Sequence, residues 1–305
     1  MHIPPTSSAG EGRGRPRLAA ERLRSHLNQP TIARYPGVFS PLVAKQATDL
    51  GFEGVYVSGA ALSADLGLPD IGLITLSEVA DRARATVQAT ELPVLVDVDT
   101  GFGGPTSVAR TVIEMEDARV AGCHIEDQIV TKRCGHLDNK VLISNDEMVQ
   151  KLRAAVHARR DPSFVIIART DARSVEGLDA AIARANDYRE AGADAIFPEG
   201  LVDAAEFARF CAAVDLPVMA NMTEFGRSDL LGVGELEEAG VALVIHPVTT
   251  LRLAMRAVRD GLTELARDGH QRNLLDRMQT RSELYDLIDY QSYARFDEMV
   301  ARFTL

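Results

Sequence analysis

Five consecutive residues, Lys132-Arg133-Cys134-Gly135-His136, bring together a thiol, an imidazole and two cations. Positive charge beside a cysteine favours its thiolate, so Cys134 could hold and deliver a proton near neutral pH. The stretch is too polar and irregular for a core, which makes it a candidate active-site loop. A surface loop with a chance cysteine is the alternative. Cys123 and Cys211 lack charged neighbours and are predicted to be core residues.

A second group with chemical potential is Asp97-Val98-Asp99. Two residues of separation on one strand place both carboxylates on the same side, with Val96 and Val98 facing the covering helices. Two hard oxygen ligands on one rigid element suit Mg²⁺, with Mn²⁺ as a substitute. Asp99 capping a turn before Gly101 is the alternative, which explains one of the two aspartates but not both.

The elements that must position these residues repeat one pattern from Tyr35 to His246. A helical stretch ends at Gly or Pro, and an apolar, β-branched run begins within a few residues. Eight such units predict an α/β protein with a closed (β/α)₈ TIM-type barrel. An open doubly wound sheet is the competitor, but its GxGxxG fingerprint is missing. The expected strands are 36–40, 55–57, 94–98, 123–125, 164–168, 195–197, 218–220 and 241–245.

Polar residues end most of these strands, and strand ends meet at the mouth of a barrel, where its active site lies. Glu126 and Glu199 could assist the metal or act as acid and base. Arg169, Arg252 and Arg281 can offer planar forks to carboxylates, although a solvated helix face is the alternative for the last two. A metal, several anion binders and a proton-donating thiol fit a small polycarboxylate that reacts through an enolate-like anion. The residues at the strand ends are Ser58, Asp97, Asp99, Glu126, Arg169, Asp171, Glu199, Asn221, Thr223 and His246.

Length and composition fit this architecture. A chain of 305 residues with 46% apolar residues can form one barrel with an appendage. The net charge of −11 disfavours nucleic acid and membranes as partners, and the Arg-Gly stretch at 12–17 reads as part of a solvated tail. Three cysteines and no apolar run near 18 residues indicate a reduced, cytoplasmic protein. We expect a disordered tail over 1–18 and one domain over 19–305, helical from about residue 250.

Seven motifs, in order, resemble the isocitrate lyase and phosphoenolpyruvate mutase superfamily, and the resemblance runs from about Leu18 to the C-terminus. Lys132-Arg133-Cys134-Gly135-His136 separates its lyase branch from the mutases, which lack that cysteine. True isocitrate lyases are longer through an inserted segment that 305 residues cannot hold. The other six motifs are Tyr56-Val57-Ser58-Gly59, Asp97 to Gly101, Ile125 to Gln128, Ile167 to Asp171, Phe197-Pro198-Glu199 and Asn221 to Glu224.

The resemblance implies Mg²⁺ near Asp97 and Asp99, with Glu126 close by, and a last helix exchanged between subunits of a homotetramer, a dimer of dimers. Ala60 departs from the glycine of some relatives, and its methyl could tighten the pocket. The residues implied to contact a tricarboxylate substrate are Ser58, Gly59, Ala60, Gly135, His136, Arg169, Glu199, Asn221, Thr223, Arg252 and Arg281.

The implied reaction is a retro-aldol-type cleavage of (2S,3R)-2-methylisocitrate to pyruvate and succinate, in the methylcitrate cycle of propionate catabolism. Cys134 would protonate the departing carbon. The group that removes the hydroxyl proton stays open among Tyr56, Glu126 and a hydroxide on the metal. The alternatives are a related enzyme on another diacid, such as a dimethylmalate lyase, an oxaloacetate decarboxylase or an isocitrate lyase side activity, and a non-catalytic binding protein on the same barrel.

Overall fold

The computed structural model describes residues 15–133, 135 and 139–302. They divide into a larger unit that extends to Thr250 and a C-terminal unit that begins at Leu251. The expected organisation, one domain over 19–305, stays a prediction. Of the predicted tail, residues 1–14 lie outside the described residues. The boundary at residue 18 is wrong, because the first helix, α1 (Arg15–Asn28), already begins at Arg15.

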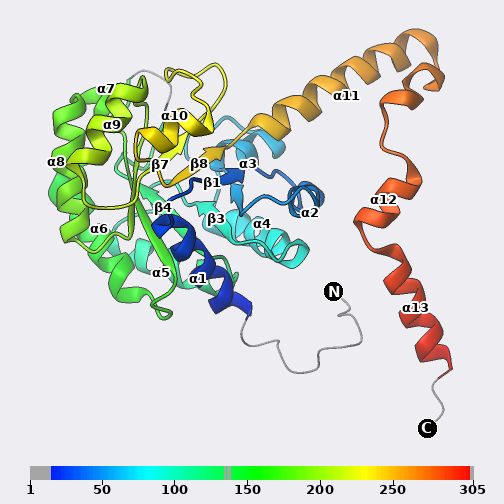
Figure 1. Cartoon of the computed structure of the whole chain (residues 1–305), viewed down its shortest axis with the longest axis horizontal. Helices are drawn as coiled ribbons and strands as arrows, with labels where there is room; N and C mark the ends of the chain where they lie inside the picture. The colour runs from blue at the N-terminus through cyan, green and yellow to red at the C-terminus, as the bar shows by residue number, and fades with distance from the viewer. Residues whose placement is uncertain (1–14, 134, 136–138, 303–305) are drawn as a thin grey trace. The chain divides into compact units, whose positions relative to one another are not determined.

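At the centre of the larger unit lie eight parallel strands, as predicted, with helices around them (Figure 1). Three of them pair in the order β1-β8-β7 and five in the order β2-β3-β4-β5-β6. Single parallel bridges from Gly37 to Tyr56 and from Ile196 to Val218 join the two sheets at both edges, which closes the barrel. The strands are β1 (Ala33–Pro36), β2 (Val55–Val57), β3 (Val94–Asp97), β4 (Gly122–Glu126), β5 (Val165–Thr170), β6 (Ala195–Pro198), β7 (Met219–Asn221) and β8 (Leu243–His246).

Helices connect consecutive strands and lie outside them (Figure 1). Parallel neighbours require a crossover of this kind, and the helices cover the outer face of the sheet. The helices that follow α1 in the larger unit are α2 (Pro41–Asp49), α3 (Gly59–Asp65), α4 (Leu76–Ala89), α5 (Pro105–Asp117), α6 (Asn145–Ala158), α7 (Ala172–Val175), α8 (Leu178–Glu190), α9 (Ala204–Ala213) and α10 (Val233–Glu238).

Strand side chains alternate between two cores. One core fills the barrel interior and includes Tyr35 and Phe197. Leu23 and Leu27 of α1 belong to the same cluster, together with residues at the starts of several strands. Helix α1 therefore covers the amino-terminal end of the barrel. The other core lies between the strands and the surrounding helices, which leaves the carboxyl ends of the strands for polar residues.

The first strand was predicted at the wrong place, over 36–40. Three other strands follow a proline, but here Pro36 is the last residue of β1 rather than its forerunner. Ala33 and Tyr35 are buried in the inner core, and the Ala33 N–H donates to Ala242 O at 3.0 Å. The charged Arg34 between them faces outward and hid the alternation in the sequence.

Two capping boxes begin helices of the barrel. At α4, Thr75 Oγ1 accepts from Glu78 N at 3.3 Å, and the Glu78 carboxylate accepts from Thr75 N at 2.7 Å. Ser144 and Glu147 pair in the same way at α6, at 3.2 and 2.9 Å. Each box satisfies backbone donors that a first helical turn leaves without partners. The sequence predicts both boxes, because Thr75 and Ser144 are each followed by Glu three residues later, and the structure confirms them.

The substitution Thr75→Ala is expected to lower the free energy of unfolding by about 1 kcal/mol, because the first turn of α4 loses its side-chain acceptor. Urea titrations followed by circular dichroism measure the change. Thr106→Ala, at an exposed position of α5, is the matched control and should change stability by less than about 0.5 kcal/mol. Equal losses in the two variants would contradict a specific contribution of the cap.

The C-terminal unit is helical. The apolar spacing of this part of the sequence predicts helices over 251–267 and 274–281 and then an amphipathic run through Leu284, Ile288, Tyr293 and Phe296. Helix α11 (Thr249–Asp268) confirms the first of these. The second is wrong, because a 3₁₀ helix, η1 (Arg272–Arg277), ends before Thr280 caps α12 (Arg281–Leu287). Asp289 has φ +53° and divides the final run between α12 and α13 (Tyr290–Ala301). Among the described residues, no helix is long and apolar enough to cross a membrane.

Candidate active site at the barrel mouth

Two aspartates lie close together at the end of β3. The prediction placed both on one strand, but only Asp97 belongs to it. The strand ends at Asp97, and Asp99 has φ +48°, in the left-handed region. Val96 and Val98 pack in the outer core, so Asp97 faces the barrel interior. A Cβ atom on Gly59 would lie 3.0 Å from an oxygen of each aspartate, and the Gly59 N–H donates to Asp97 Oδ2 at 3.1 Å. The turn, rather than a continuing strand, brings the carboxylates together.

The pKa values of the two carboxylates are shifted in opposite directions. Burial would raise the pKa of Asp97, but the facing His124 and Lys132 outweigh it and lower that pKa. Burial and the charge on Asp97 raise the pKa of Asp99 to about 6. Added positive charge at this place would favour the ionised form of Asp99.

The donor set fits a hard cation. Among the described residues, Asp99 Oδ2 has no hydrogen-bond donor, whereas Asp99 Oδ1 and Glu126 Oε2 form ion pairs with Lys132 and Arg169. Buried carboxylate oxygens without donors are costly, and a cation would offset that cost. Within the described ranges, no group of three or more His, Cys, Asp or Glu forms a ready metal cage. The site therefore suits Mg²⁺, which keeps several waters, better than an ion coordinated only by protein.

Lys132 connects the cysteine motif to the acidic pair. Its buried ammonium pairs with Asp70 and lies 3.0 Å from Asp99 Oδ1. Burial alone would lower the pKa of Lys132, but the carboxylates around it raise that pKa, so it stays charged. Asp70, in the loop between α3 and α4, was missed in the sequence, because an isolated aspartate in an irregular segment carries no periodicity. The available signal was the length of this loop after β2, since such loops build a barrel mouth.

Two side chains hold the backbone of the motif. Gln128 Nε2 donates to Arg133 O at 2.8 Å and to Glu126 Oε1 at 3.1 Å, and Gln128 Oε1 accepts from Arg133 N at 3.0 Å. The buried Lys140 Nζ donates to Gly135 O at 2.6 Å. These contacts place Arg133 and Gly135 beside the carboxyl end of β4. Lys140 and Gln128 had no predicted role, and only the fold could show that they are buried here.

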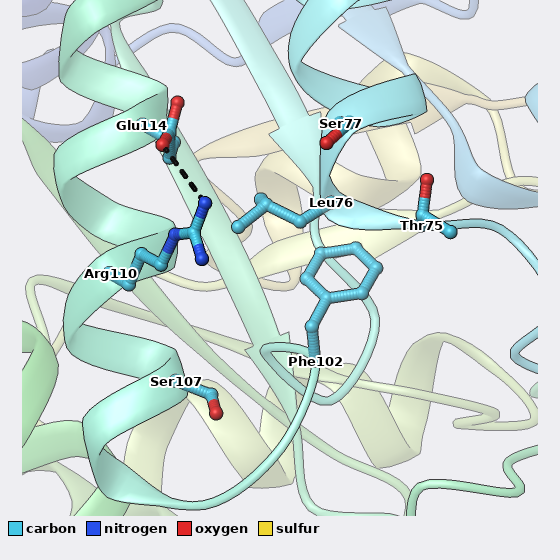
Figure 2. A pocket seen from close by; sticks show the side chains of 7 residues that line it. All are labelled: Thr75, Leu76, Ser77, Phe102, Ser107, Arg110 and Glu114. Atoms are coloured by element: carbon cyan, nitrogen blue, oxygen red, sulfur yellow. Dashed lines mark ion pairs between the residues drawn. The ribbon is translucent and has the colours of Figure 1, made fainter.

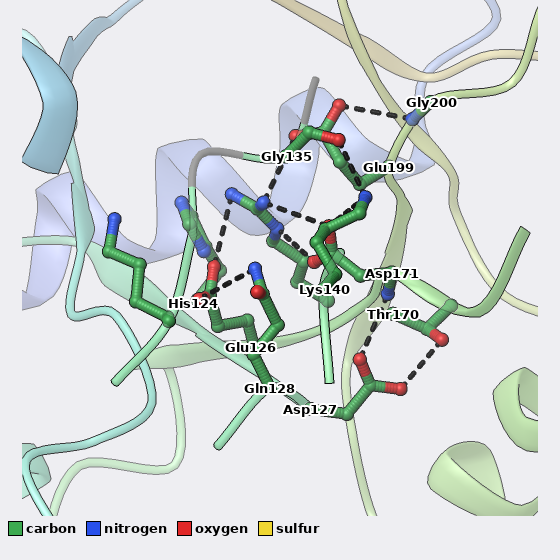
Figure 3. Close-up of polar contacts among 12 residues, drawn as sticks. His124, Glu126, Asp127, Gln128, Gly135, Lys140, Thr170, Asp171, Glu199 and Gly200 are labelled. Atoms are coloured by element: carbon green, nitrogen blue, oxygen red, sulfur yellow. Dashed lines mark hydrogen bonds and ion pairs between the residues drawn. The ribbon is translucent and has the colours of Figure 1, made fainter. Parts of the chain in front are cut away.

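Arg169 on β5 is the central cation of the mouth, and the carboxylates that it contacts, Glu126, Asp171 and Glu199, are labelled in Figure 3. Its Nε donates to Asp171 Oδ2 at 2.9 Å, while Nη1 lies 3.3 Å from Glu126 and Nη2 lies 3.4 Å from Glu199. A Cβ atom on Gly135 would lie 2.5 Å from Arg169 Nη2. The guanidinium thus contacts three carboxylates, and only glycine leaves room for it.

Tyr56 and His124 form a hydrogen-bonded pair beside Asp97. The Tyr56 hydroxyl lies 2.7 Å from His124 Nε2 and donates to Asp97 Oδ2 at 3.4 Å. Burial raises the pKa of Tyr56 and lowers the pKa of His124 to about 4. Burial also raises the pKa of Glu126, against the charges of Arg169 and Lys132. Both side chains considered as base therefore have a raised pKa.

Nine of the predicted site residues share one contact network. Asn221 Nδ2 completes it by donating to Glu199 Oε2 at 3.2 Å. Their roles in binding and catalysis remain predictions. The nine residues are Tyr56, Gly59, Asp97, Asp99, Glu126, Gly135, Arg169, Glu199 and Asn221.

The other predicted site residues are not among these nine. The Ser58 hydroxyl accepts from Ala61 N at 3.3 Å and caps α3, which is a structural use of that side chain. Thr223 is buried just after β7. Of the remaining predicted residues, Ala60 lies in the first turn of α3, Cys134 and His136 lie outside the described residues, and Arg252 and Arg281 belong to the C-terminal unit.

A separate pocket of about 260 Å³ lies between α4 and α5 (Figure 2). It shares no residue with the network at the mouth, and its charged groups, Arg110 and Glu114, pair with each other at 3.7 Å. We therefore assign the chemistry to the mouth. The pocket is lined by Thr75, Leu76, Ser77, Phe102, Ser107, Arg110 and Glu114.

A closed parallel barrel with acids and an arginine at the carboxyl ends of its strands defines the class: a (β/α)₈ protein whose mouth suits a small anionic ligand. Residues 23–266 match the family model of phosphoenolpyruvate phosphomutase. The chain is 58% identical to "Probable 2-methylisocitrate lyase 2" of Corynebacterium glutamicum, over 91% of each chain. It is 48% identical to 2-methylisocitrate lyase of Halalkalibacterium halodurans, over 94% of this chain and 95% of that one.

Solved structures of similar fold point to the same family. A 2,3-dimethylmalate lyase superposes with a TM-score of 0.87 at 35% identity, over 92% of this chain and 95% of that one. A phosphonopyruvate hydrolase in complex with oxalate and Mg²⁺ superposes with a TM-score of 0.83 at 29% identity, over 93% and 99%. The chain belongs to the phosphoenolpyruvate mutase/isocitrate lyase superfamily. The resemblance seen in the sequence motifs is confirmed.

Proposed function

We propose that this chain is a carbon–carbon lyase that cleaves (2S,3R)-2-methylisocitrate to pyruvate and succinate, in the methylcitrate cycle of propionate catabolism. The observation that carries the proposal is the 58% identity to a relative of that name over 91% of each chain. The mouth supports it independently, because an acidic pair suited to a cation lies in one network with a buried arginine. These are the groups that a hydroxy-polycarboxylate requires.

Asp97 and Asp99 would hold a divalent cation, Mg²⁺ or Mn²⁺, with Glu126 nearby. When bound, the cation would supply positive charge that stabilises an oxyanion on the substrate. The guanidinium of Arg169 would pair with a substrate carboxylate, because its planar fork matches two oxygens. Asn221 would donate a hydrogen bond to the same end of the substrate.

Proton movements would fall to Glu126 and Cys134. Glu126 would accept the hydroxyl proton, since burial raises its pKa and so makes its carboxylate a stronger base. The bond between the two carbons then breaks, pyruvate forms, and the electron pair stays on the carbon of the succinate fragment. Cys134 would give its proton to that carbon. Tyr56 stays protonated and orients Asp97 through its hydroxyl.

The test of this function is the release of pyruvate from 2-methylisocitrate, with isocitrate as the competing substrate and Mg²⁺ supplied. A preference for the methyl substrate of at least 100-fold in kcat/KM, on the order that a built pocket achieves, supports the proposal. A preference for isocitrate, or cleavage of dimethylmalate alone, would replace it with another member of the superfamily. No turnover of any of the three would leave an oxaloacetate decarboxylase or the non-catalytic binding protein.

We also propose a homotetramer in which C-terminal helices are exchanged between subunits. Support comes from α11, where apolar residues follow a 4-3-4-3 spacing typical of a helix that packs against another helix. Most of them are exposed in the single chain. Light scattering should give about four times the 33.1 kDa chain mass, and a monodisperse monomer would contradict the assembly. The spaced residues are Leu251, Met255, Val258, Leu262 and Leu265.

A further inference from the structure

Asp127 follows Glu126 at the end of β4 and points to the opposite side, away from the mouth. Its buried carboxylate is nevertheless bound to β5 (Figure 3). Oδ1 accepts from the backbone N–H of Asp171 at 2.9 Å, and Oδ2 accepts from Thr170 Oγ1 at 2.7 Å. Tyr188 of α8 donates to Oδ2 at 2.9 Å. One carboxylate outside the barrel therefore fixes two consecutive residues at the end of β5.

The residue fixed in this way holds the arginine of the mouth. Asp171 accepts from Arg169 Nε at 2.9 Å and from Arg169 Nη2 at 3.3 Å. Its Oδ1 also accepts from Lys140 Nζ at 2.7 Å. Asp171 is fully buried, so its orientation depends on these contacts and on its backbone. A shift of the Asp171 backbone would move the acceptor that aims the Arg169 guanidinium.

Burying the Asp127 carboxylate is costly unless donors compensate for the lost water. Arg184 of α8 supplies part of that compensation, since its Nη1 lies 3.5 Å from Asp127 Oδ2, although its Nη2 pairs more closely with Glu176 at 2.8 Å. What the acid adds is direction, because hydrogen bonds from a backbone N–H and a hydroxyl fix the end of β5 in a way that apolar contacts do not.

We propose that Asp127 is a positioning residue for Arg169, acting through the Asp171 backbone and carboxylate from outside the mouth. The proposal rests on the proposed function in one respect, that Arg169 binds a carboxylate of the substrate. Asp127 itself does not touch the ligand. A small displacement of a binding group costs catalysis heavily, and a misplacement of about 1 Å can cost 100-fold.

The experiment is a double-mutant cycle on the full chain with Mg²⁺, measuring kcat and KM for pyruvate release. Arg169→Lys should lower kcat/KM by about 100-fold, because lysine cannot reproduce the fork. Asp127→Asn keeps the shape but weakens the acceptors, and about a tenfold loss is expected, with the same division between kcat and KM as in Arg169→Lys. If Asp127 acts through Arg169, the double variant should lose about 100-fold rather than about 1000-fold.

Two further variants separate positioning from stability. Tyr188→Phe removes a donor to the same carboxylate on the α8 side, and it should lower the unfolding temperature while kcat/KM stays within about twofold. Thr170→Val removes the donor on the β5 side and should lower kcat/KM by about threefold, which keeps the test open if Asp127→Asn fails to fold. A 1000-fold loss in the double variant, or equal kinetic losses in Tyr188→Phe and Asp127→Asn, would overturn the proposal.

The positioning role of Asp127 can be tested even if the proposed substrate is wrong. If the wild-type chain does not cleave 2-methylisocitrate, the proposed function fails, and the same cycle is then measured as oxalate binding by calorimetry. A weaker affinity in Asp127→Asn that disappears on the Arg169→Lys background still supports the positioning role. Unchanged affinity in Asp127→Asn, with weaker affinity in Arg169→Lys, would reject it whatever the substrate is.

Discussion

Replacing Cys134 with serine is expected to lower kcat for pyruvate release by about 1000-fold, with little change in KM. A serine hydroxyl is a far weaker acid than a thiol, so it cannot deliver the proton that the succinate fragment needs. In the sequence Lys132 and Arg133 directly precede this cysteine, where positive charge would favour a thiolate, and a serine hydroxyl would not be ionised by the same charges. Steady-state assays on 2-methylisocitrate, at saturating Mg²⁺, measure the loss.

Cys211→Ser is the matched control for this variant. Cys211 lies on α9, and burial raises its pKa to about 12, so it cannot serve as a proton donor near neutral pH. Its replacement should change kcat by less than about twofold. If Cys134→Ser keeps more than a tenth of the wild-type kcat, another group delivers the proton, and the thiol has a different role.

Removing divalent cations with EDTA is expected to lower pyruvate release by more than about 1000-fold, with recovery on addition of Mg²⁺ or Mn²⁺. The physical reason lies in the acidic pair, where Asp97 and Asp99 are both buried and Asp99 Oδ2 has no hydrogen-bond donor among the described residues. A second readout does not depend on turnover. Mg²⁺ should raise the unfolding temperature of the wild-type chain, because a ligand that binds only the folded state stabilises it.

Asp99→Asn should abolish most of that thermal shift and raise the Mg²⁺ concentration for half-maximal activity by about 10 to 100-fold. Asp49→Asn, at the exposed end of α2, is the control and should respond to Mg²⁺ like the wild type. Full activity in EDTA, or an equal thermal shift in Asp99→Asn and the wild type, would show that the pair does not hold the cation.

The sequence predicted the barrel because its signals are local. Gly and Pro at the helix-to-strand junctions and the capping boxes at Thr75 and Ser144 act within a few residues of where they stand. Strand β1 was misplaced for the same reason, since Arg34 interrupts a short apolar run whose burial depends on pairing with β8, more than 200 residues later. Long-range pairing leaves no mark on so short a segment.

The candidate site was predictable at strand ends and not beyond them. Asp97 and Arg169 stand at the ends of apolar runs, where the position itself identifies them. Asp70 and Lys140 lie in irregular loops, and their burial follows only from the partners that the fold supplies, Lys132 and Asp171. The Asp97–Asp99 pair shows the difference within one motif, since the strand accounts for the first residue and a left-handed turn for the second.

Helix α1 limits how small molecules can enter and leave the barrel. It covers the amino-terminal end of the barrel, and large side chains such as Tyr35 and Phe197 fill the interior above it. The barrel interior is therefore open only at the carboxyl ends of the strands. Whatever enters at the carboxyl ends of the strands has to leave by the same opening, so two products of one cleavage must depart past each other or in turn. The product that remains then occupies the place of the next substrate molecule.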